Sequence, residues 1–366
     1  KQLNIVVAGC VAQAEGKEII RRQPIVDIVV GPQTYHRLPE ILNRLSNKQR
    51  KIVDTEFPVE NKFDELKKIR INKNAVAFLS IQEGCDKFCS FCVVPYTRGA
   101  EYSRPVLDII SEAKNLILQG AKEICLLGQN VNAYHGLYKN RSMSLSELIM
   151  EIANLSGVKR IRYMTSHPAD MSEDLIVAHG KVDILLPYLH LPVQSGDNNV
   201  LEFMNRKYTV ESYIKIINKL RNVRQDMAFS SDFIVGFPGE TKDAFNNTLN
   251  LVKEVNYCQA YSFKYSRRPG TPGSVLKGQV AENIKDERLS ELQNILNEQQ
   301  LSFNNRFIGK SFDVLLERTG KKDNQLVGKS PYMQAVHVKT KNHKIGDIVK
   351  INILRADKNS LEGKCI

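Results

Sequence analysis

The segment GCDKFCSFC gathers three of the seven cysteines of this 366-residue chain within eight positions. Cys85, Cys89 and Cys92 follow the spacing Cys-x3-Cys-x2-Cys, and no further cysteine follows for more than thirty residues. Thiolates are soft ligands that prefer zinc or iron–sulfur clusters. A structural zinc and a four-iron cluster each normally take four protein ligands. Three cysteines therefore predict a cluster in which one iron is open to a small chelating molecule and can pass an electron to it. A zinc site completed by a distant histidine, or three incidental thiols, are the alternatives.

The cysteine segment directly follows the first strand of a regular strand–helix alternation. Strand-like runs occupy residues 75–81, 123–129, 160–166, 184–193, 228–237 and 259–266, with helical patterns between most of them. Six such units indicate a parallel sheet of the α/β class but are too few for an eightfold barrel. We therefore predict a partial (β/α)6 barrel over residues 75–275. Ligands bind at the carboxyl ends of parallel strands, and the cysteines lie after such an end.

Shorter regions flank this alternation on both sides. Residues 1–46 follow a strand–helix–strand–helix pattern, which is an incomplete α/β domain, and the charged segment 47–74 is interpreted as a linker. Residues 276–302 are predicted to form a connecting helix. In residues 303–366, about five short runs bounded by Gly, Asn and Asp predict a small all-β barrel.

Charge and cysteine usage restrict the partners and the compartment. The chain has a net charge of +12, and residues 301–366 contribute +7 of it, from 13 Lys and Arg against 6 Asp and Glu. This concentration favours a polyanionic partner such as nucleic acid at the C-terminal end. No apolar run approaches the ~18 residues of a membrane span, so no membrane partner is expected. An odd number of cysteines, three of them clustered, favours a reducing compartment, and we predict a cytoplasmic location.

Further motifs occur in a fixed order around the cysteines: CSFCVVPYTRGAEYSRP, LLGQNVNAY, RYMTSHP, LHLPVQSG, SSDFIVGFPGET and YSRRPGTPG. In order and spacing they resemble the methylthiotransferases, a family of radical S-adenosylmethionine enzymes, over nearly the whole chain. Among these, the resemblance is greatest to the members that modify N6-isopentenyladenosine in tRNA. The C-terminal region resembles the TRAM domain, an RNA-binding, OB-like barrel.

The resemblance implies a ligand set and a set of cofactor contacts. Cys85, Cys89 and Cys92 would hold a [4Fe–4S] cluster whose open iron binds S-adenosylmethionine, and reductive cleavage would yield a 5′-deoxyadenosyl radical. Cofactor contacts are expected from Phe91, Gln129, Gln194, Ser195, Gly236, Gly239 and Glu240.

The family also carries a second, auxiliary [4Fe–4S] cluster held by three cysteines of its N-terminal domain. Cys10, in VAGCVAQ, matches the third of these, and the other two would precede Lys1. Because the chain begins with Lys inside a strand-like run, we interpret it as an N-terminally truncated form without a complete auxiliary ligand set. Cys125 and Cys258 match no cluster ligand and are predicted to be buried apolar residues.

The implied reaction is methylthiolation of C2 of N6-isopentenyladenosine beside the tRNA anticodon. Its expected partners are the anticodon stem-loop, S-adenosylmethionine and an electron donor such as flavodoxin or ferredoxin. A truncated RNA-binding form without sulfur insertion is one alternative. Methylthiolation of a related tRNA adenosine or of a ribosomal protein is another.

Several aromatic and histidine residues are candidates for additional roles. Phe307, Phe312 and Tyr332 could stack RNA bases, although Phe312 alternates with Val314 and is therefore expected in the core. The histidines His135, His167 and His190 are weaker candidates than the cysteines, because hydrogen abstraction by a radical requires no titrating base.

Overall fold

The computed structural model describes residues 3–46, 51–57 and 74–366. The described chain divides into two compact units. The smaller contains the described residues within Lys1–Arg70, together with Glu83–Phe88 and Cys92–Tyr102. The larger contains those within Ile71–Gln82, together with Cys89–Phe91 and Ser103–Ile366. The chain passes between the units inside the three-cysteine segment.

The smaller unit is built on a parallel sheet with the strand order β1-β2-β3. Its strands are β1 (Val6–Ala8), β2 (Ile28–Val30) and β3 (Ile52–Asp54). Its helices are α1 (Cys10–Glu15), α2 (Lys17–Arg22), η1 (Pro32–Arg37), α3 (Leu38–Ser46) and α5 (Val94–Arg98). Ile28, Val30, Ile41 and Ile52 form part of its core.

The strand–helix–strand–helix order predicted for the first 46 residues is confirmed. Strand β3 lies inside the predicted linker and is a correction to it, because three residues in a charged run give no periodic signal. Residues 47–50 and 58–73 of that linker lie outside the described residues. The domain boundaries themselves remain a prediction.

The larger unit contains six parallel strands that alternate with helices, as the sequence predicts. The strands form the orders β10-β7-β4 and β11-β12-β13, and a bridge between Ile161 and Leu185 connects the two groups. The strands are β4 (Val76–Ser80), β7 (Glu123–Leu127), β10 (Arg160–Tyr163), β11 (Tyr188–His190), β12 (Ala228–Val235) and β13 (Gln259–Lys264). The partial (β/α)6 barrel is therefore confirmed.

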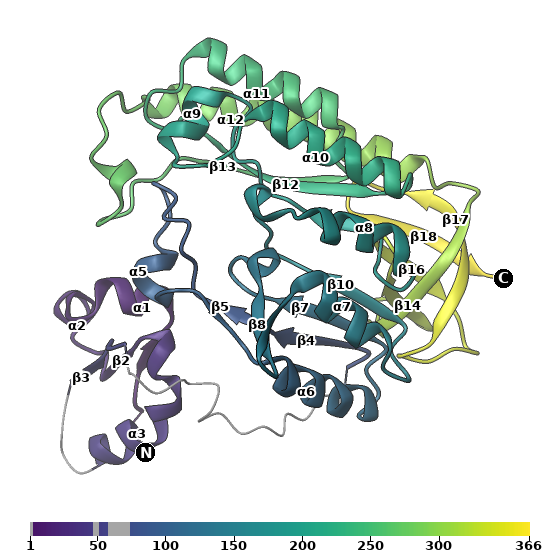
Figure 1. Cartoon of the computed structure of the whole chain (residues 1–366), viewed down its shortest axis with the longest axis horizontal. Coiled ribbons are helices and arrows are strands. Elements are labelled where there is room, and N and C mark those ends of the chain that lie inside the picture. Colours follow the sequence, from purple (N-terminus) through teal and green to yellow (C-terminus); the bar gives the residue numbers. More distant parts are fainter. Residues whose placement is uncertain (1–2, 47–50, 58–73) are drawn as a thin grey trace. The chain divides into compact units, whose positions relative to one another are not determined.

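Helices cover one face of these strands, with α10 and α11 along β12 and β13 and α6 and α7 along β4 and β7 (Figure 1). They are α6 (Val106–Leu118), α7 (Leu145–Ala153), α8 (Glu173–Lys181), α9 (Asn198–Phe203), α10 (Val210–Val223) and α11 (Lys242–Val255). The connections contain two short strand pairs, β5 (Gln82–Glu83) with β6 (Tyr102–Ser103) and β8 (His135–Tyr138) with β9 (Arg141–Ser144). They also contain the 3-10 turns η2 (Val131–Ala133), η3 (Pro168–Asp170) and η4 (Pro272–Ser274).

Alternation along the strands separates the two faces. Leu79, Leu126, Leu189 and Phe233 pack in the main core with the helices. Successive side chains of a strand point to opposite faces. The residues that alternate with these four along their strands therefore face the barrel interior. Asp232 is such a residue, and its register partner on β13 is Tyr261.

A long helix, α12 (Glu282–Asn305), leads into a closed five-stranded barrel with the order β14-β15-β16-β18-β17 (yellow-green to yellow in Figure 1). Its strands are β14 (Ser311–Thr319), β15 (Gln325–Lys329), β16 (Ala335–Lys339), β17 (Ile348–Ala356) and β18 (Ser360–Cys365). The five predicted runs are thus all strands. No helix in the described ranges combines the length and the apolarity needed to cross a bilayer.

The aromatic residues considered for base stacking pack on one another. The rings of Phe307 and Tyr332 are stacked with centroids 5.1 Å apart, and Phe312 meets Phe307 edge-on at 5.5 Å. Phe303 of α12 joins the same apolar cluster. Phe312 is partly buried and packs against this cluster, which agrees with the position expected for it. The burial of Phe307 is a correction to its proposed contact with RNA bases. Tyr332 is only partly buried, so its contact with RNA stays a prediction.

The small barrel docks on the amino ends of β7 and β10. Arg160 donates to the carbonyl oxygens of Lys329 and Asp313 at 3.0 and 2.8 Å. Arg162 donates to the carbonyl oxygens of Ser330 and Pro331 at 2.7 and 2.8 Å. Both arginines are buried, so these bonds are made away from water.

The buried pair Tyr163–His179 gives the fold a pH dependence. The Tyr163 hydroxyl lies 2.6 Å from His179 Nε2, and burial, assisted by the nearby Arg224, lowers the pKa of His179 from 6.5 to about 3. Between these values only the unfolded chain binds the proton, so this stability is present above pH 6.5 and is lost as the pH falls towards 3. We expect His179 to account for a loss of about 2 kcal/mol in the free energy of unfolding between pH 7 and pH 5.

Urea denaturation at both pH values measures this loss. His179→Gln should show a smaller pH dependence than the parent. Equal pH dependence of the parent and His179→Gln would contradict the assignment.

Candidate active site

The segment Cys89–Phe91 is fixed in the larger unit by backbone hydrogen bonds on both sides. The Ser90 amide donates to the Met204 carbonyl at 3.0 Å, just after α9. The Gly273 amide donates to the Ser90 carbonyl at 2.7 Å, from η4 in the YSRRPGTPG motif. Two motifs far apart in sequence thus position the middle cysteine.

Phe91 packs in a small apolar cluster with Phe237 and Tyr265. The Phe237 and Tyr265 rings meet edge-on with centroids 4.9 Å apart. Phe237 belongs to the GFPGE segment, so the structure brings the aromatic residue of the cysteine motif to the loop after β12.

Cys89 is buried, and its sulfur faces a buried arginine. Arg206 Nη1 donates to Cys89 Sγ at 3.4 Å, and Nη2 donates to the Pro192 carbonyl at 2.6 Å. Its Nε donates to the Tyr208 hydroxyl at 2.8 Å, and that hydroxyl donates to the Val193 carbonyl. Burial acts to lower the pKa of Arg206, but Tyr208 and Cys89 outweigh it and raise the pKa, so the guanidinium remains charged.

Cys85 and Cys92 belong to the smaller unit. The Cys85 amide donates to the Gly99 carbonyl at 3.3 Å, and the Val94 amide donates to Cys92 Sγ at 3.4 Å. Across the described parts of the chain, no three His, Cys, Asp or Glu side chains are arranged to hold a metal ion. The three-cysteine ligand set therefore remains a prediction.

Cys10 begins α1 and also has an arginine partner. Arg98, the last residue of α5, donates from Nε to Cys10 Sγ at 3.2 Å and from Nη1 to Glu83 at 2.7 Å. Burial acts to lower the pKa of Arg98, but Glu83 and Cys10 more than offset it and raise the pKa. Within the smaller unit, Arg98 thus links the candidate auxiliary ligand to the start of the cysteine segment.

Gln129 follows β7, and its backbone is held by a residue that sequence reasoning missed. Gln82 is buried, and its Oε1 accepts the amides of Gln129 and Asn130 at 2.8 and 3.1 Å. The only sequence signal for this role is that Gln82 is a polar residue directly after the predicted strand that precedes the cysteines.

Gln194 and Ser195 follow β11, but they are held differently. Gln194 has a positive φ of 75° and bridges to β12, with its amide on the Asp232 carbonyl at 2.9 Å. Ser195 is buried, and its hydroxyl lies 3.4 Å from that of Thr248 on α11. Ser195 therefore fixes the strand end against a helix.

The loop after β12 is closed by an internal ion pair. Glu240 is buried, accepts the Gly236 amide at 2.8 Å and pairs with Arg288 of α12 at 2.6 Å. Burial raises the pKa of Glu240, while the Gly236 amide and Arg288 oppose that rise. Gly236 and Gly239 have φ values of +70° and +86°, which favour glycine, and a Cβ at Gly236 would clash with the Lys285 side chain. The glycines and Glu240 thus set the shape of this loop.

His190, which the sequence ranks below the cysteines as a candidate, belongs to a group of polar side chains inside the barrel. His190 Nδ1 lies 2.6 Å from the Ser230 hydroxyl, and Nε2 lies 3.6 Å from Asp232 Oδ2. Tyr261 is half-exposed and meets the His190 ring edge-on. Because β11, β12 and β13 are adjacent, residues about seventy positions apart meet here. His167 is instead engaged with Asn132 through backbone and amide groups, and His135 is exposed.

Comparison with known proteins identifies the family. A model of the radical SAM superfamily matches residues 79–252, and a TRAM domain model matches residues 305–366. The tRNA-2-methylthio-N(6)-dimethylallyladenosine synthase of Wolbachia sp. subsp. Brugia malayi is 55% identical over 368 residues, covering 100% of this chain and 83% of the relative. This chain belongs to the tRNA-2-methylthio-N(6)-dimethylallyladenosine synthase family. A synthase of the same name from Sphingopyxis alaskensis is 55% identical, with 98% and 80% covered.

Solved structures resemble this family member in fold alone. The radical S-adenosylmethionine methyltransferase TsrM from Kitasatospora setae has a TM-score of 0.56 at 14% identity, covering 74% of this chain and 57% of that one. The cobalamin-dependent S-adenosylmethionine radical enzyme OxsB has a TM-score of 0.52 at 12% identity, covering 80% and 43%. The chain thus spans less than two thirds of each of these proteins.

Membership of the radical SAM superfamily implies a [4Fe–4S] cluster and S-adenosylmethionine in this synthase family member. The surroundings of Cys89 suit its role as an anionic thiolate ligand, since the buried guanidinium of Arg206 faces its sulfur. Cys125 and Cys258 do not fit, because burial raises the pKa of each thiol to about 12. Their predicted role as buried apolar residues is confirmed.

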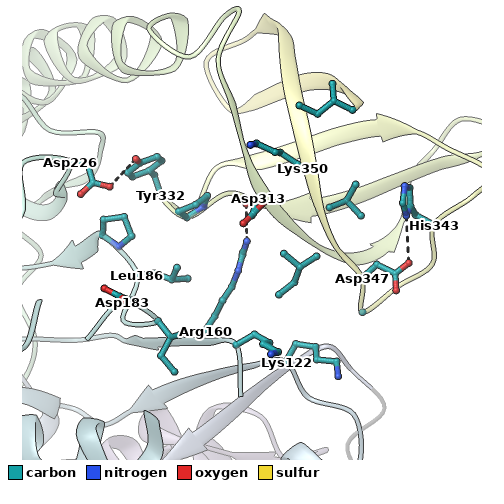
Figure 2. A pocket seen from close by; sticks show the side chains of 18 of the residues that line it. Lys122, Arg160, Asp183, Leu186, Asp226, Asp313, Tyr332, His343, Asp347 and Lys350 are labelled. Carbon is teal, nitrogen blue, oxygen red and sulfur yellow. Dashed lines mark hydrogen bonds and ion pairs between the residues drawn. The ribbon is translucent and has the colours of Figure 1, made fainter. Parts of the chain in front are cut away.

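A cleft of about 970 Å³ lies between the barrel and the TRAM domain of this synthase family member (Figure 2). Lys122 and Lys159 line it directly before β7 and β10, so it lies at the strand ends opposite to those that the candidate site residues follow. Its charges are nearly balanced, and several are paired internally, such as Tyr332 with Asp226 and His343 with Asp347. The charged residues are Lys122, Lys159, Arg160, Arg224, Lys350, Asp183, Asp226, Asp313 and Asp347. Such a surface gives a polyanion little electrostatic binding energy, because its positive and negative charges nearly cancel.

Proposed function

We propose that this chain methylthiolates C2 of N6-dimethylallyladenosine in tRNA. The observation that carries the proposal is 55% identity over the whole chain to synthases of that name, barrel and TRAM domain together. An aromatic C–H bond resists acid–base chemistry, which is consistent with a radical cofactor. A cytoplasmic location remains part of the proposal.

The proposed cluster ligands are Cys85, Cys89 and Cys92. A [4Fe–4S] cluster with S-adenosylmethionine would supply one-electron reduction and a 5′-deoxyadenosyl radical that removes hydrogen from C2. This proposal is supported by the hydrogen bonds at Ser90 and the aromatic packing of Phe91, which fix the segment that carries Cys89.

The other proposed cofactor residues divide into two groups. Gln129, Gln194 and the backbone at Gly236 and Gly239 follow strand ends and are proposed to contact S-adenosylmethionine. Ser195 and Glu240 are proposed to act by holding those backbones, since their polar atoms bond within the protein. Cys10 is proposed as a ligand of the auxiliary cluster, supported by its arginine partner. A flavodoxin or ferredoxin is proposed as the electron donor.

The direct test is nucleoside analysis after anaerobic reconstitution. The chain would be incubated with S-adenosylmethionine, a reductant and tRNA carrying N6-dimethylallyladenosine, and the digest examined for its 2-methylthio derivative by mass spectrometry. Formation of that nucleoside supports the proposal. Binding of tRNA and release of 5′-deoxyadenosine without the nucleoside would favour RNA binding without sulfur insertion, and a methylthiolated ribosomal protein instead would favour a ribosomal substrate.

The RNA contact is proposed for two adjoining loops of the TRAM domain. The Thr340 amide donates to the Asn324 carbonyl at 2.9 Å, which joins the β14–β15 turn to the β16–β17 loop. These loops, with the adjoining end of β16, carry the exposed cations Lys321, Lys322, Lys339, Lys341 and Lys344. Unlike the cleft of Figure 2, they present mostly one sign of charge.

Charge reversal on these loops should weaken tRNA binding. We expect Lys321→Glu/Lys341→Glu to lower affinity about tenfold or more near 0.1 M salt. The slope of log K against log salt should decrease by about 1.5, since each lost phosphate contact contributes ~0.7–0.9. Filter binding across a salt series measures both quantities.

Lys122→Glu/Lys350→Glu in the cleft is the matched control, with the same change of charge. It should alter the affinity and the salt slope much less. An equal effect of the two double variants would show that net charge alone governs binding.

A further inference from the structure

Four backbone carbonyl groups of the TRAM domain receive their hydrogen bonds from two arginines of the barrel. Arg160 and Arg162, in β10, donate to the carbonyl oxygens of residue 313 and residues 329–331 at 2.7 to 3.0 Å. The two arginines are 3% and 2% exposed, and Ser330 is fully buried. A buried carbonyl that loses its donor costs free energy. The TRAM domain therefore cannot shift on the barrel without leaving these groups unpaired or admitting water to the interface.

An apolar core crosses the same interface. One cluster of buried residues combines the amino ends of barrel strands with α12 and the TRAM strands. Its members include Tyr188, Ala228, Phe303, Val314, Val336 and Ile351. Interfaces between domains of one chain are usually polar enough to allow relative motion. A shared core that also encloses two arginines instead indicates that the barrel and the TRAM domain move as one body.

The same contacts hold the hairpin that carries one of the proposed RNA loops. Asp313 lies on β14 and Lys329 on β15, and the turn between these strands carries Lys321 and Lys322. Arg160 donates to the carbonyl oxygen of each strand, so it fixes both arms of this hairpin on the barrel.

The candidate site residues lie at the other end of the barrel. The TRAM domain docks at the amino ends of the strands, whereas Cys89, Gln129 and Gln194 follow carboxyl ends. Strand β12 has eight residues, so the two ends are about 26 Å apart at ~3.3 Å per residue. A rotation of the TRAM domain by about 10° would move a point at that distance by about 5 Å. Misplacement of a reacting group by ~1 Å can already cost ~10²-fold in rate.

We infer that Arg160, with Arg162 beside it, is a positioning residue that fixes the orientation of the TRAM domain and thereby selects which nucleotide of a bound tRNA reaches the site. The inference rests on the proposed function, which supplies the tRNA and its contact with the TRAM loops. Phosphate contacts set the register of a nucleic acid but carry no sequence information themselves. The interface held by the arginines transmits that register to the opposite end of the barrel.

Photocrosslinking on the full chain tests this without reference to turnover. A tRNA that carries 8-azidoadenosine in place of the target adenosine would be bound at saturation and irradiated. Mass spectrometry would then give the fraction of bound tRNA that is attached to residues 128–134 and 191–196, which follow β7 and β11. We expect this fraction to fall about fivefold or more in Arg160→Met, because the nucleotide no longer meets the site in one register. Filter binding should give a tRNA affinity within about twofold of the parent, because the loop lysines are unchanged.

Arg221→Met is the matched control, with the same change of side chain and of charge. Arg221 also donates to a backbone carbonyl, that of Val255, but both residues belong to barrel helices. We expect its crosslinked fraction to equal that of the parent. Arg160→Lys keeps the charge but lacks the planar fork that bonds two carbonyls at once. Its crosslinked fraction should therefore lie between those of the parent and Arg160→Met.

The outcomes separate this inference from the proposed function. A parent-like crosslinked fraction in Arg160→Met would overturn the inference and leave the proposed function intact. An equal fall in Arg221→Met would also overturn it, because the effect would then come from a general loss of stability. If Arg160→Met fails to fold, Arg160→Lys decides, and a fraction equal to that of the parent counts against the inference. A parent that binds tRNA without attaching to these segments would overturn both proposals, whereas absence of methylthiolation alone would overturn only the proposed function.

Discussion

Replacing Cys89 with alanine is expected to abolish assembly of the radical cluster and, with it, all cleavage of S-adenosylmethionine. The proposed cluster has only three protein ligands, and Cys89 is the one that faces a buried guanidinium. Two remaining thiolates would leave two irons without protein ligands. Iron and acid-labile sulfide per chain, after anaerobic reconstitution in a Cys10→Ala background, measure the loss. The background chain should hold about four irons and the variant close to none.

Cys125→Ala is the control for this result. Cys125 is buried in β7, and burial with the nearby Glu123 raises the pKa of its thiol to about 12, so it supplies no thiolate near neutral pH. Its removal should leave the iron content unchanged. Zinc in place of iron in the parent, or full iron content in Cys89→Ala, would contradict the radical-cluster assignment.

Arg162→Ala is expected to reduce the free energy of unfolding by about 3–5 kcal/mol, because it leaves the buried Glu123 carboxylate without its hydrogen-bonded cation and with only the more distant Arg160, at 3.9 Å. Arg162 Nε donates to Glu123 Oε1 at 2.7 Å, and the two side chains are 1% and 3% exposed. The same guanidinium holds the carbonyls of Ser330 and Pro331, so its loss also weakens the docking of the TRAM domain on the barrel. Equilibrium denaturation of the full chain measures the change.

Arg141→Ala gives a matched comparison on the surface. Arg141 pairs with Glu147 at the same 2.7 Å, but the side chains are 57% and 34% exposed. Water screens such a pair, so we expect a loss of at most about 1 kcal/mol. Similar losses in both variants would mean that burial does not govern the strength of the Arg162 pair.

The alternation of strands and helices could be predicted because it is a local property of the sequence. The six barrel strands and the five TRAM strands appear as short apolar or alternating runs between turn residues, and the structure contains all of them. Strand β3 was missed because three residues among charged neighbours have no measurable period. Cys85, Cys89 and Cys92 were likewise evident, since three thiols in one loop suggest metal chemistry wherever the loop lies.

Roles that depend on a distant partner could not be predicted in this way. Glu240 was assigned to the cofactor with its motif, but in the fold its carboxylate pairs with Arg288. Phe307 was predicted to stack on RNA bases, but its ring is buried and stacks on Tyr332 within the protein. In both cases the competing partner lies tens of residues away and leaves no local signal.

The sequence by itself thus determined the family, the order of elements and the cysteine motif, because spacing and periodicity are written along the chain. Only the tertiary structure decided which charges are buried and what they face. A lone arginine looks the same in the sequence whether it is solvated or enclosed. The fold alone encloses Arg206 against Cys89, and burial is what gives that contact its strength.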